Sequence, residues 1–336
     1  MWTSEVWRPP FQGKGDVRYY SLARYALIEA FRLAGVHSGS RILLPEYLCR
    51  DVLSTLHLLG AHPRWYPVAA DMLPATTPED WPAADCVLAV NYFGFPQDLA
   101  PFQAYAERTG AIVIEDNSHG YLSCDSEGKW LGCRTGLGVF SFRKTLRIPD
   151  GAALWAGASQ AALQLPIQVP LDGTGFNSAQ LFKGYIRRLP LVGELAYRLS
   201  VVSVRAMRKW RSRFDIQVSN LQSEMTLPAS ANAWVGLLPA LAAVDEKVEI
   251  ERRREAYVRC AAYGVQAGVV PVFAELPSHC APYGYAFRGD ILALARMRRY
   301  ASNHGFDLLT WPDLPSAIID ESPVHYRNVY LVNFLW

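Results

Sequence analysis

Short apolar runs and stretches of helical periodicity alternate over the first half of the chain. Apolar residues recur at helical spacing over residues 16–36, 52–59 and 100–109, which predicts helices there. The runs that are typical of buried strands cover residues 41–45, 63–68, 85–91, 111–116, 137–142 and 151–155. Strands that are apolar throughout and alternate with helices are typical of a parallel sheet covered on both faces. The pattern therefore predicts an α/β fold with a mostly parallel sheet.

The regular alternation stops near residue 155. Residues 181–214 contain nine lysines and arginines and one acidic residue, with apolar residues between them, which predicts one or two basic amphipathic helices. A smaller αβ region follows, with expected strands at 269–273 and 328–334 and an expected helix at 291–304. We therefore expect two domains, namely a large domain over residues 1–230 and a smaller C-terminal α/β domain over residues 231–336.

Composition narrows the class of protein and its partners. With 336 residues, of which 51% are hydrophobic and 19% charged, the chain fits an ordinary globular enzyme and not a disordered protein. A net charge of +2 argues neither for nor against an acidic partner, and we expect no nucleic-acid partner. We expect no membrane span, because no uncharged apolar run reaches ~18 residues, and no secretory signal. Six scattered cysteines without a Cys-x-x-Cys pair predict reduced thiols, a cytoplasmic location and no metal site.

An acidic residue and a lysine each follow an apolar run. Asp116 ends the predicted strand at 111–116, and Lys144 follows the run at 137–142. Ligands of open α/β sheets bind beyond the carboxyl ends of the strands. A lysine that bonds to an aldehyde and a carboxylate that keeps a pyridine nitrogen protonated are what an enzyme needs to hold pyridoxal 5′-phosphate (PLP). We therefore interpret Lys144 and Asp116 as catalytic residues of a PLP site; a helix cap and a solvated lysine are the structural alternatives.

Two polar side chains near this pair are further candidates for binding the cofactor. His119 lies three residues after Asp116 in an expected turn, where its ring can hydrogen-bond the cofactor or serve only the loop. Ser141 precedes Lys144 by three residues, and its hydroxyl can bind the phosphate or simply occupy a strand.

The other two candidate regions lie near the start of the chain. Ala23 and Arg24 lie where the first predicted helix opens, and free amides and the helix dipole at such a start favour phosphate. Tyr47 lies just past the strand at 41–45, and its ring either stacks on the cofactor or packs in the core.

Two separated segments resemble the DegT/DnrJ/EryC1/StrS family of PLP-dependent sugar aminotransferases. Residues 115–119 (Glu-Asp-Asn-Ser-His) match the family's Glu-Asp-x-x-His/Gln motif. Residues 140–144 (Phe-Ser-Phe-Arg-Lys) match the family's Phe-Ser-Phe segment and the lysine that follows it. The resemblance implies the fold type I architecture of aspartate aminotransferase. It further implies that Asp116 contacts the pyridine nitrogen, that His119 lies beside the cofactor, and that Ser141 binds the phosphate.

The resemblance also implies an activity and an assembly. The expected reaction transfers an amino group from an amino-acid donor such as glutamate to a keto-sugar carried on a nucleotide. Because the same lysine and aspartate serve other PLP reactions, dehydration, decarboxylation and aldol-type cleavage stay open. A degenerate, non-catalytic protein that binds a partner or a membrane surface through residues 181–214 is a third hypothesis. Active sites of fold type I are shared between two subunits, so a homodimer is implied.

Overall fold

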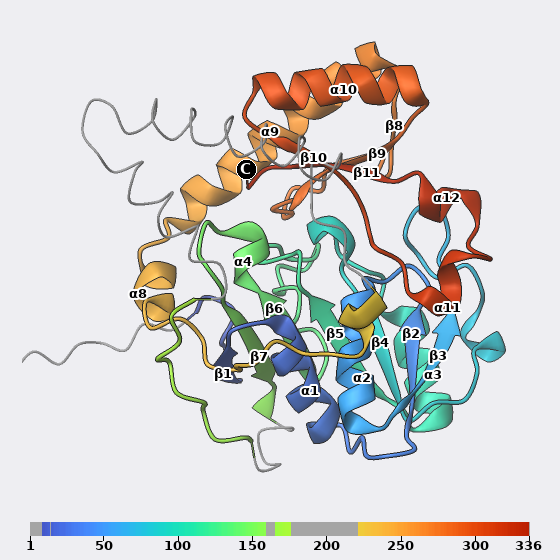
Figure 1. Ribbon diagram of the computed structural model, residues 1–336, viewed down its shortest axis with the longest axis vertical. Helices are drawn as coiled ribbons and strands as arrows, with labels where there is room; N and C mark the ends of the chain where they lie inside the picture. Colours follow the sequence, from blue (N-terminus) through green and yellow to red (C-terminus); the bar gives the residue numbers. More distant parts are fainter. Residues whose placement is uncertain (1–8, 14, 159–164, 176–220, 336) are drawn as a thin grey trace, which may run out of the picture.

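Seven strands form the main sheet of the computed structural model, which describes residues 9–13, 15–158, 165–175 and 221–335 (Figure 1). They are β1 (Asp16–Tyr20), β2 (Arg41–Pro45), β3 (His62–Tyr66), β4 (Cys86–Val90), β5 (Ile112–Asn117), β6 (Leu137–Ser141) and β7 (Ala152–Ala156). Their order across the sheet is β1-β7-β6-β5-β4-β2-β3. Every pair from β3 across to β6 is parallel, and only β7 runs against its neighbours. The predicted α/β fold with a mostly parallel sheet is confirmed.

The first strand corrects the sequence-based prediction for residues 16–36. Residues 16–20 form β1 rather than the beginning of a helix, and the helix α1 (Ala23–Leu33) starts later. The cause is long-range pairing, since β1 lies antiparallel to β7 with Val17 opposite Trp155. Its valine and tyrosines also favour extended structure.

Helices cover the sheet and connect its strands. They are α1, α2 (Leu53–Leu59), α3 (Ala100–Thr109), the short α4 (Phe142–Thr145), and the 3₁₀ turns η1 (Arg50–Val52), η2 (Pro78–Asp80) and η3 (Tyr92–Gly94). The buried face of α1 includes Ala26, Ala30 and Phe31, and the helix packs on β6 and β7. The helices predicted at 52–59 and 100–109 are present, and β4 and β6 are buried along their whole length. A sheet covered in this way leaves its strand ends as the place for a site.

A second, antiparallel sheet of four strands lies in the C-terminal part of the chain, with the order β10-β11-β9-β8. Its elements are β8 (Val270–Pro271), β9 (Gly284–Arg288), β10 (Asp307–Thr310), β11 (Tyr330–Asn333), α9 (Glu246–Ala267), α10 (Ile291–Asn303), α11 (Ser316–Ile319) and α12 (Val324–Arg327). The sequence predicted β8, β11 and α10. It missed β9 and β10, which are short and become strands by pairing with β11.

The second sheet lies above the edge of the main sheet from which α4 emerges (Figure 1). That edge carries the carboxyl ends of the parallel strands. One continuous apolar cluster includes Val87 and Ile114 of the main sheet and Tyr285 and Leu331 of the second sheet. The two sheets therefore enclose the strand ends at which the sequence placed its candidate residues.

The chain between the two sheets packs first against the main sheet. It includes η4 (Leu221–Glu224) and α8 (Leu237–Ala242). Leu237 and Leu241 of α8 join a second apolar cluster with Phe140 and Phe142. The domain boundary between residues 230 and 231 stays a prediction. The predicted basic helices at 181–214 lie outside the described residues.

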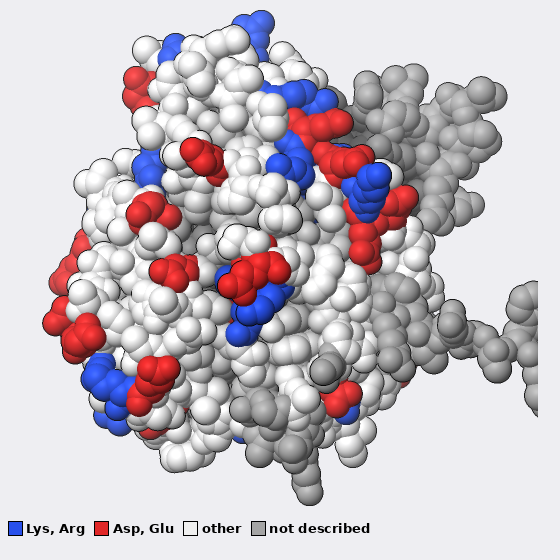
Figure 2. All heavy atoms as spheres, turned by 180° about the vertical axis from the view of Figure 1, so that it is seen from behind, with Lys and Arg blue, Asp and Glu red and all other residues white. Residues whose placement is uncertain are grey.

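The outer surface seen from behind carries both signs of charge. Lysine and arginine side chains are interspersed with aspartate and glutamate on the face drawn in Figure 2. The described residues of that face form no extended basic surface. Within the described ranges, no helix combines the length and apolar character that crossing a membrane requires.

Candidate active site

A cavity of about 170 Å³ lies at the carboxyl ends of β4, β5 and β6. It brings together residues that are far apart in the sequence, from α1, η1, the three strands, α4 and the segment before α11. The lining residues are Leu22, Ala23, Arg24, Leu27, Leu48, Cys49, Asp51, Val52, Val90, Asp116, Ser118, His119, Val139, Ser141, Arg143, Lys144 and Trp311. All the predicted site residues except Tyr47 therefore meet in one cavity.

Lys144 and His119 are in direct contact within this cavity. Lys144 belongs to α4, which begins immediately after β6, and its Nζ lies 3.1 Å from Nε2 of His119. The backbone N–H of Phe93 donates to Nδ1 of His119 at 3.3 Å. An Nδ1 that accepts leaves the ring proton on Nε2, so the neutral amine of Lys144 acts as the acceptor. The hydrogen-bond pattern therefore fits an uncharged lysine.

Burial favours the same charge state. Burial lowers the pKa of the Lys144 amine below its ordinary range, although Cys49 and Asp116 oppose the shift. Burial also holds the pKa of His119 well below its usual value, and the charge of Lys144 lowers it further. A neutral amine is the form that attacks an aldehyde.

Two aromatic rings hold the imidazole of His119 in place. The ring of Tyr283 stacks on it with centroids 4.7 Å apart and planes 1° apart. The ring of Trp311 meets it edge-on with centroids 5.0 Å apart. Both aromatic residues come from the C-terminal half of the chain, so that half helps to orient the nitrogen that contacts Lys144.

Asp116 and Glu115 point to opposite faces of β5, as neighbours on a strand do. Oδ1 of Asp116 accepts a hydrogen bond from the N–H of Ser118 at 2.8 Å, and the carboxylate faces the cavity. Glu115 is fully buried on the other face, where Nε of Arg134 donates to it at 2.8 Å and Asn91 donates at 2.8 Å. This buried, hydrogen-bonded ion pair fixes the strand end that carries Asp116.

The start of α1 forms a second wall that suits an anion. Leu22, Ala23 and Arg24 line the cavity, and no side chain caps the helix. The first turn contains no acidic residue, so its amides and dipole favour a negative group. Ser141 faces the same space from the end of β6.

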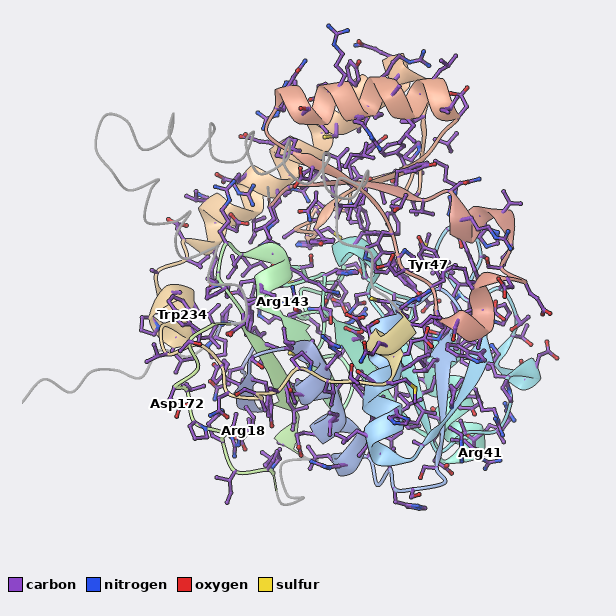
Figure 3. The ribbon with its side chains drawn as sticks, in the orientation of Figure 1. Arg18, Arg41, Tyr47, Arg143, Asp172 and Trp234 are labelled. Atoms are coloured by element: carbon purple, nitrogen blue, oxygen red, sulfur yellow. The ribbon has the colours of Figure 1, made fainter. Side chains whose placement is uncertain are left out.

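Tyr47 does not line the cavity, in contrast to one of the two interpretations of its position. Its ring is fully buried among Tyr92, Trp311 and Tyr326, and its hydroxyl donates to the backbone oxygen of Trp311 at 2.5 Å. Figure 3 labels it well apart from α4, toward the C-terminal segment. Tyr47 therefore connects the main sheet to the segment that brings Trp311 to the site.

The lining residues that were not predicted as site residues include Cys49, Asp51, Arg143 and Trp311. Arg143 is the one with a local signal, because it directly precedes Lys144. Cys49, Asp51 and Trp311 reach the cavity only through the packing of η1 and of the C-terminal segment, and no spacing in the sequence indicates this.

One family of known proteins matches the part of the chain that carries the candidate site residues Asp116, His119, Ser141 and Lys144. Residues 29–155, which include β5, β6 and the lysine on α4, match the model of the DegT/DnrJ/EryC1/StrS aminotransferase family. This stretch of the chain is similar to the DegT/DnrJ/EryC1/StrS aminotransferases. The match confirms the resemblance that residues 115–119 and 140–144 indicated.

Solved structures share the fold of nearly the whole chain. DesV from S. venezuelae is 17% identical, with a TM-score of 0.60 over 98% of this chain and 84% of its own. A protein from Streptococcus pneumoniae described as a sugar aminotransferase, in its PMP form, is 13% identical, with a TM-score of 0.62 over 97% of this chain and 82% of its own.

A third solved structure with this fold is described as a dehydratase. ColD, a GDP-4-keto-6-deoxymannose-3-dehydratase, is 12% identical, with a TM-score of 0.55 over 96% of this chain and 85% of its own. At these identities the likeness establishes the fold, and it confirms the predicted fold type I architecture. It does not by itself choose among reactions.

Proposed function

We propose that this protein is a PLP-dependent aminotransferase that moves an amino group from an amino-acid donor, such as glutamate, to a keto-sugar carried on a nucleotide. One observation supports the proposal above all others: a partly buried lysine and an aspartate face the same cavity at the carboxyl end of a parallel sheet. A family of aminotransferases matches the same stretch of chain.

The donor set of the cavity fits the cofactor at three places. Asp116 would pair with the pyridine nitrogen and favour its protonated form. Lys144 would hold the aldehyde carbon covalently. The start of α1, with Ala23, Arg24 and the hydroxyl of Ser141, would hold the phosphate. When bound, PLP supplies an electron sink that stabilises negative charge on the substrate carbon next to the nitrogen.

The residues of the chain then move one proton and exclude water. When it is not bonded to the cofactor, the Lys144 amine would act as the base that takes a proton from the donor carbon and gives it back. His119 holds Nζ of Lys144 in line for both transfers through the 3.1 Å contact. The apolar side chains of Val90, Val139 and Trp311 shield that nitrogen from bulk water. A lysine with a lowered pKa suits general-base work near neutral pH.

The similar structures support a nucleotide-linked sugar as the acceptor. ColD was solved with GDP-perosamine bound, and the S. pneumoniae protein is described as a sugar aminotransferase. Dehydration is the alternative reaction, since ColD is a dehydratase. Transfer from glutamate releases 2-oxoglutarate with each turnover, whereas dehydration without net transfer of the amino group to the sugar does not.

The decisive test is whether Lys144 carries the cofactor. Purified protein loaded with PLP is expected to show the visible absorption band of a lysine-bound cofactor, and borohydride is expected to fix the label on the peptide that contains residue 144. Lys144→Ala removes the bond-forming amine, so the band and the label should disappear. Lys247→Ala, on the exposed face of α9, is the control and should keep both. A wild-type protein that takes up no PLP contradicts the proposal.

The proposal extends to a homodimer and a cytoplasmic location. The homodimer is supported by the resemblance to fold type I enzymes, and sedimentation velocity at micromolar concentration should give twice the mass of one chain. The cytoplasmic location is supported by the six cysteines, which are all free thiols.

A further inference from the structure

Arg143 faces the cavity beside Lys144 and has an unsatisfied donor. Its Nε is buried, and the structure of the described residues gives this nitrogen no hydrogen-bond partner. Figure 3 shows Arg143 at the base of α4. Buried polar groups in proteins are almost always hydrogen-bonded, and an unpaired donor on a charged group is especially unfavourable. The position of Arg143 indicates that a ligand supplies the missing hydrogen-bond acceptor for its guanidinium.

A second unsatisfied atom of opposite charge lies in the same cavity. Oδ1 of Asp51 is buried, and among the described residues it has no hydrogen-bond partner. The other oxygen of Asp51 lies 3.8 Å from the guanidinium of Arg24. The cavity wall thus presents an unpaired cationic donor and an unpaired anionic acceptor. An α-amino acid carries the two complementary charges.

The other charged groups of the cavity already have proposed partners, and Arg143 does not. Its lining includes two arginines, Arg24 and Arg143, the amine of Lys144, and two carboxylates, Asp51 and Asp116. Arg24 lies at the proposed phosphate site and near Asp51, Asp116 is assigned to the pyridine nitrogen, and Lys144 bonds to the cofactor. Among the described residues no carboxylate lies within 4.0 Å of the Arg143 guanidinium, although the charge of Asp51 acts on its pKa. A guanidinium keeps its charge even when buried and matches a carboxylate with two parallel N–H donors.

We propose that Arg143 binds the α-carboxylate of the amino donor and, after transfer, that of the 2-oxo acid product. The inference rests on the proposed aminotransferase function and adds the group that selects the donor. Arg143 and Lys144 are consecutive residues on one short helix, and the amino and carboxylate groups of an α-amino acid are attached to one carbon. Binding the carboxylate at Arg143 therefore brings the donor nitrogen toward the position of Lys144 Nζ.

The groups that act on Arg143 come from both halves of the chain. Burial lowers the pKa of its guanidinium, while Tyr283 opposes the shift and Arg24 reinforces it. Tyr283 is also the residue that stacks on His119. Arg143 thus lies between the start of α1 and the segment leading into β9, beside the ring that positions Lys144. A donor carboxylate there would lie next to the reacting groups.

The test compares a donor with a carboxylate and a donor without one. PLP-loaded wild type, Arg143→Gln and Arg143→Lys are titrated with L-alanine and with ethylamine, and the change in the visible band gives each apparent Kd. Arg143→Gln should keep its cofactor. Its apparent Kd for L-alanine should be about tenfold higher or more than that of wild type, since a charge-assisted bidentate contact is lost. The apparent Kd for ethylamine should not change. Arg143→Lys should bind L-alanine more tightly than Arg143→Gln but less tightly than wild type.

A cofactor-free measurement separates this inference from the proposed function. Calorimetric titration with 2-oxoglutarate, in inorganic phosphate that fills the start of α1, should give about tenfold weaker binding for Arg143→Gln than for wild type. Arg147→Gln, an exposed arginine of the same segment outside the cavity lining, is the matched control. If wild type takes up no PLP but this difference persists, the aminotransferase proposal fails and the carboxylate site stands.

Three results would overturn the inference. An Arg143→Gln protein that folds by circular dichroism but no longer takes up PLP would assign Arg143 to the phosphate. Equal weakening of L-alanine and ethylamine would show a general distortion of the site. Unchanged binding of L-alanine and 2-oxoglutarate would show that the donor carboxylate lies elsewhere.

Discussion

The neutral form of Lys144 results from two independent features of its surroundings. Burial disfavours the ammonium, and the proton on Nε2 of His119 calls for an acceptor at Nζ. The folded-state pKa of Lys144 lies below the ordinary lysine value of 10.5. At pH values between these two pKa values, Lys144 binds a proton in the unfolded chain but not in the folded protein. In that window the contribution of Lys144 to the free energy of unfolding rises with pH.

The substitution Lys144→Met tests this directly. Methionine fills a similar volume without a titrating group. The free energy of unfolding of the cofactor-free wild type, minus that of the variant, should rise as the pH increases from 7 toward 10. Urea unfolding at a series of pH values measures the difference, and the raised pKa values of the buried tyrosines cancel in it. Lys247→Met on the surface should show no such trend; the same flat profile for Lys144→Met would mean that Lys144 is charged in the folded protein.

The element that places the lysine is the β6–α4 junction, and its position depends on a close backbone approach. A Cβ at Gly138 of β6 would overlap the carbonyl oxygen of Gly132. The loop that starts at Gly132 leads to Arg134, whose backbone N–H and guanidinium both bind Glu115. Glycine at 138 therefore allows this loop to lie against β6 and to fix the neighbouring strand end of Asp116.

Gly138→Ala should destabilise the protein by about 2–3 kcal/mol, because the overlap is with backbone and cannot be relieved by a rotamer change. The free energy of unfolding from urea titration measures the effect. Gly157→Ala is the control, since the nearest atom to its added Cβ is on the Trp155 ring at 3.1 Å, and its cost should be clearly smaller. Equal costs would mean that the Gly132 loop adjusts freely.

The molecule as a whole forms its site between the main sheet and the C-terminal part of the chain. Arg253 of α9 is 1% exposed, and it donates to the backbone oxygen of Tyr121 at 2.8 Å and to Glu249 at 2.7 Å. Tyr121 follows His119 by two residues. The long helix α9 therefore holds the loop that carries the imidazole.

Arg253→Met should lower the free energy of unfolding by about 1–3 kcal/mol, because it leaves the buried backbone oxygen of Tyr121 without this donor. Glu249 keeps its hydrogen bonds from Arg252 in the variant. Thermal and urea unfolding measure the loss. Arg259→Met is the matched control on the same helix, since its contact with Glu255 is exposed and 4.0 Å long, and it should change stability by less than ~0.5 kcal/mol. A loss no larger than that of the control would show that α9 does not hold this loop.

Local patterns were sufficient for most of the main sheet and for the centre of the site. The strand predicted at 41–45 and the helix predicted at 100–109 have the bounds found in the structure. Their signals, which are the spacing of apolar residues and a glycine at the end of the helix, lie within or next to the element itself. Asp116 and Lys144 could be predicted to meet because both follow strands of one parallel sheet, whose carboxyl ends share an edge.

By itself the sequence determined the α/β class, the strand ends and the two residues proposed for the chemistry, since these depend on periodicity within a segment and on side-chain type. Only the tertiary structure decided that residues 16–20 pair with β7, that Tyr47 turns into the core, and that Asp51, Arg143 and Trp311 line the cavity. The physical reason is that strand pairing, burial and unsatisfied hydrogen bonds depend on residues distant in the chain, which no local pattern records.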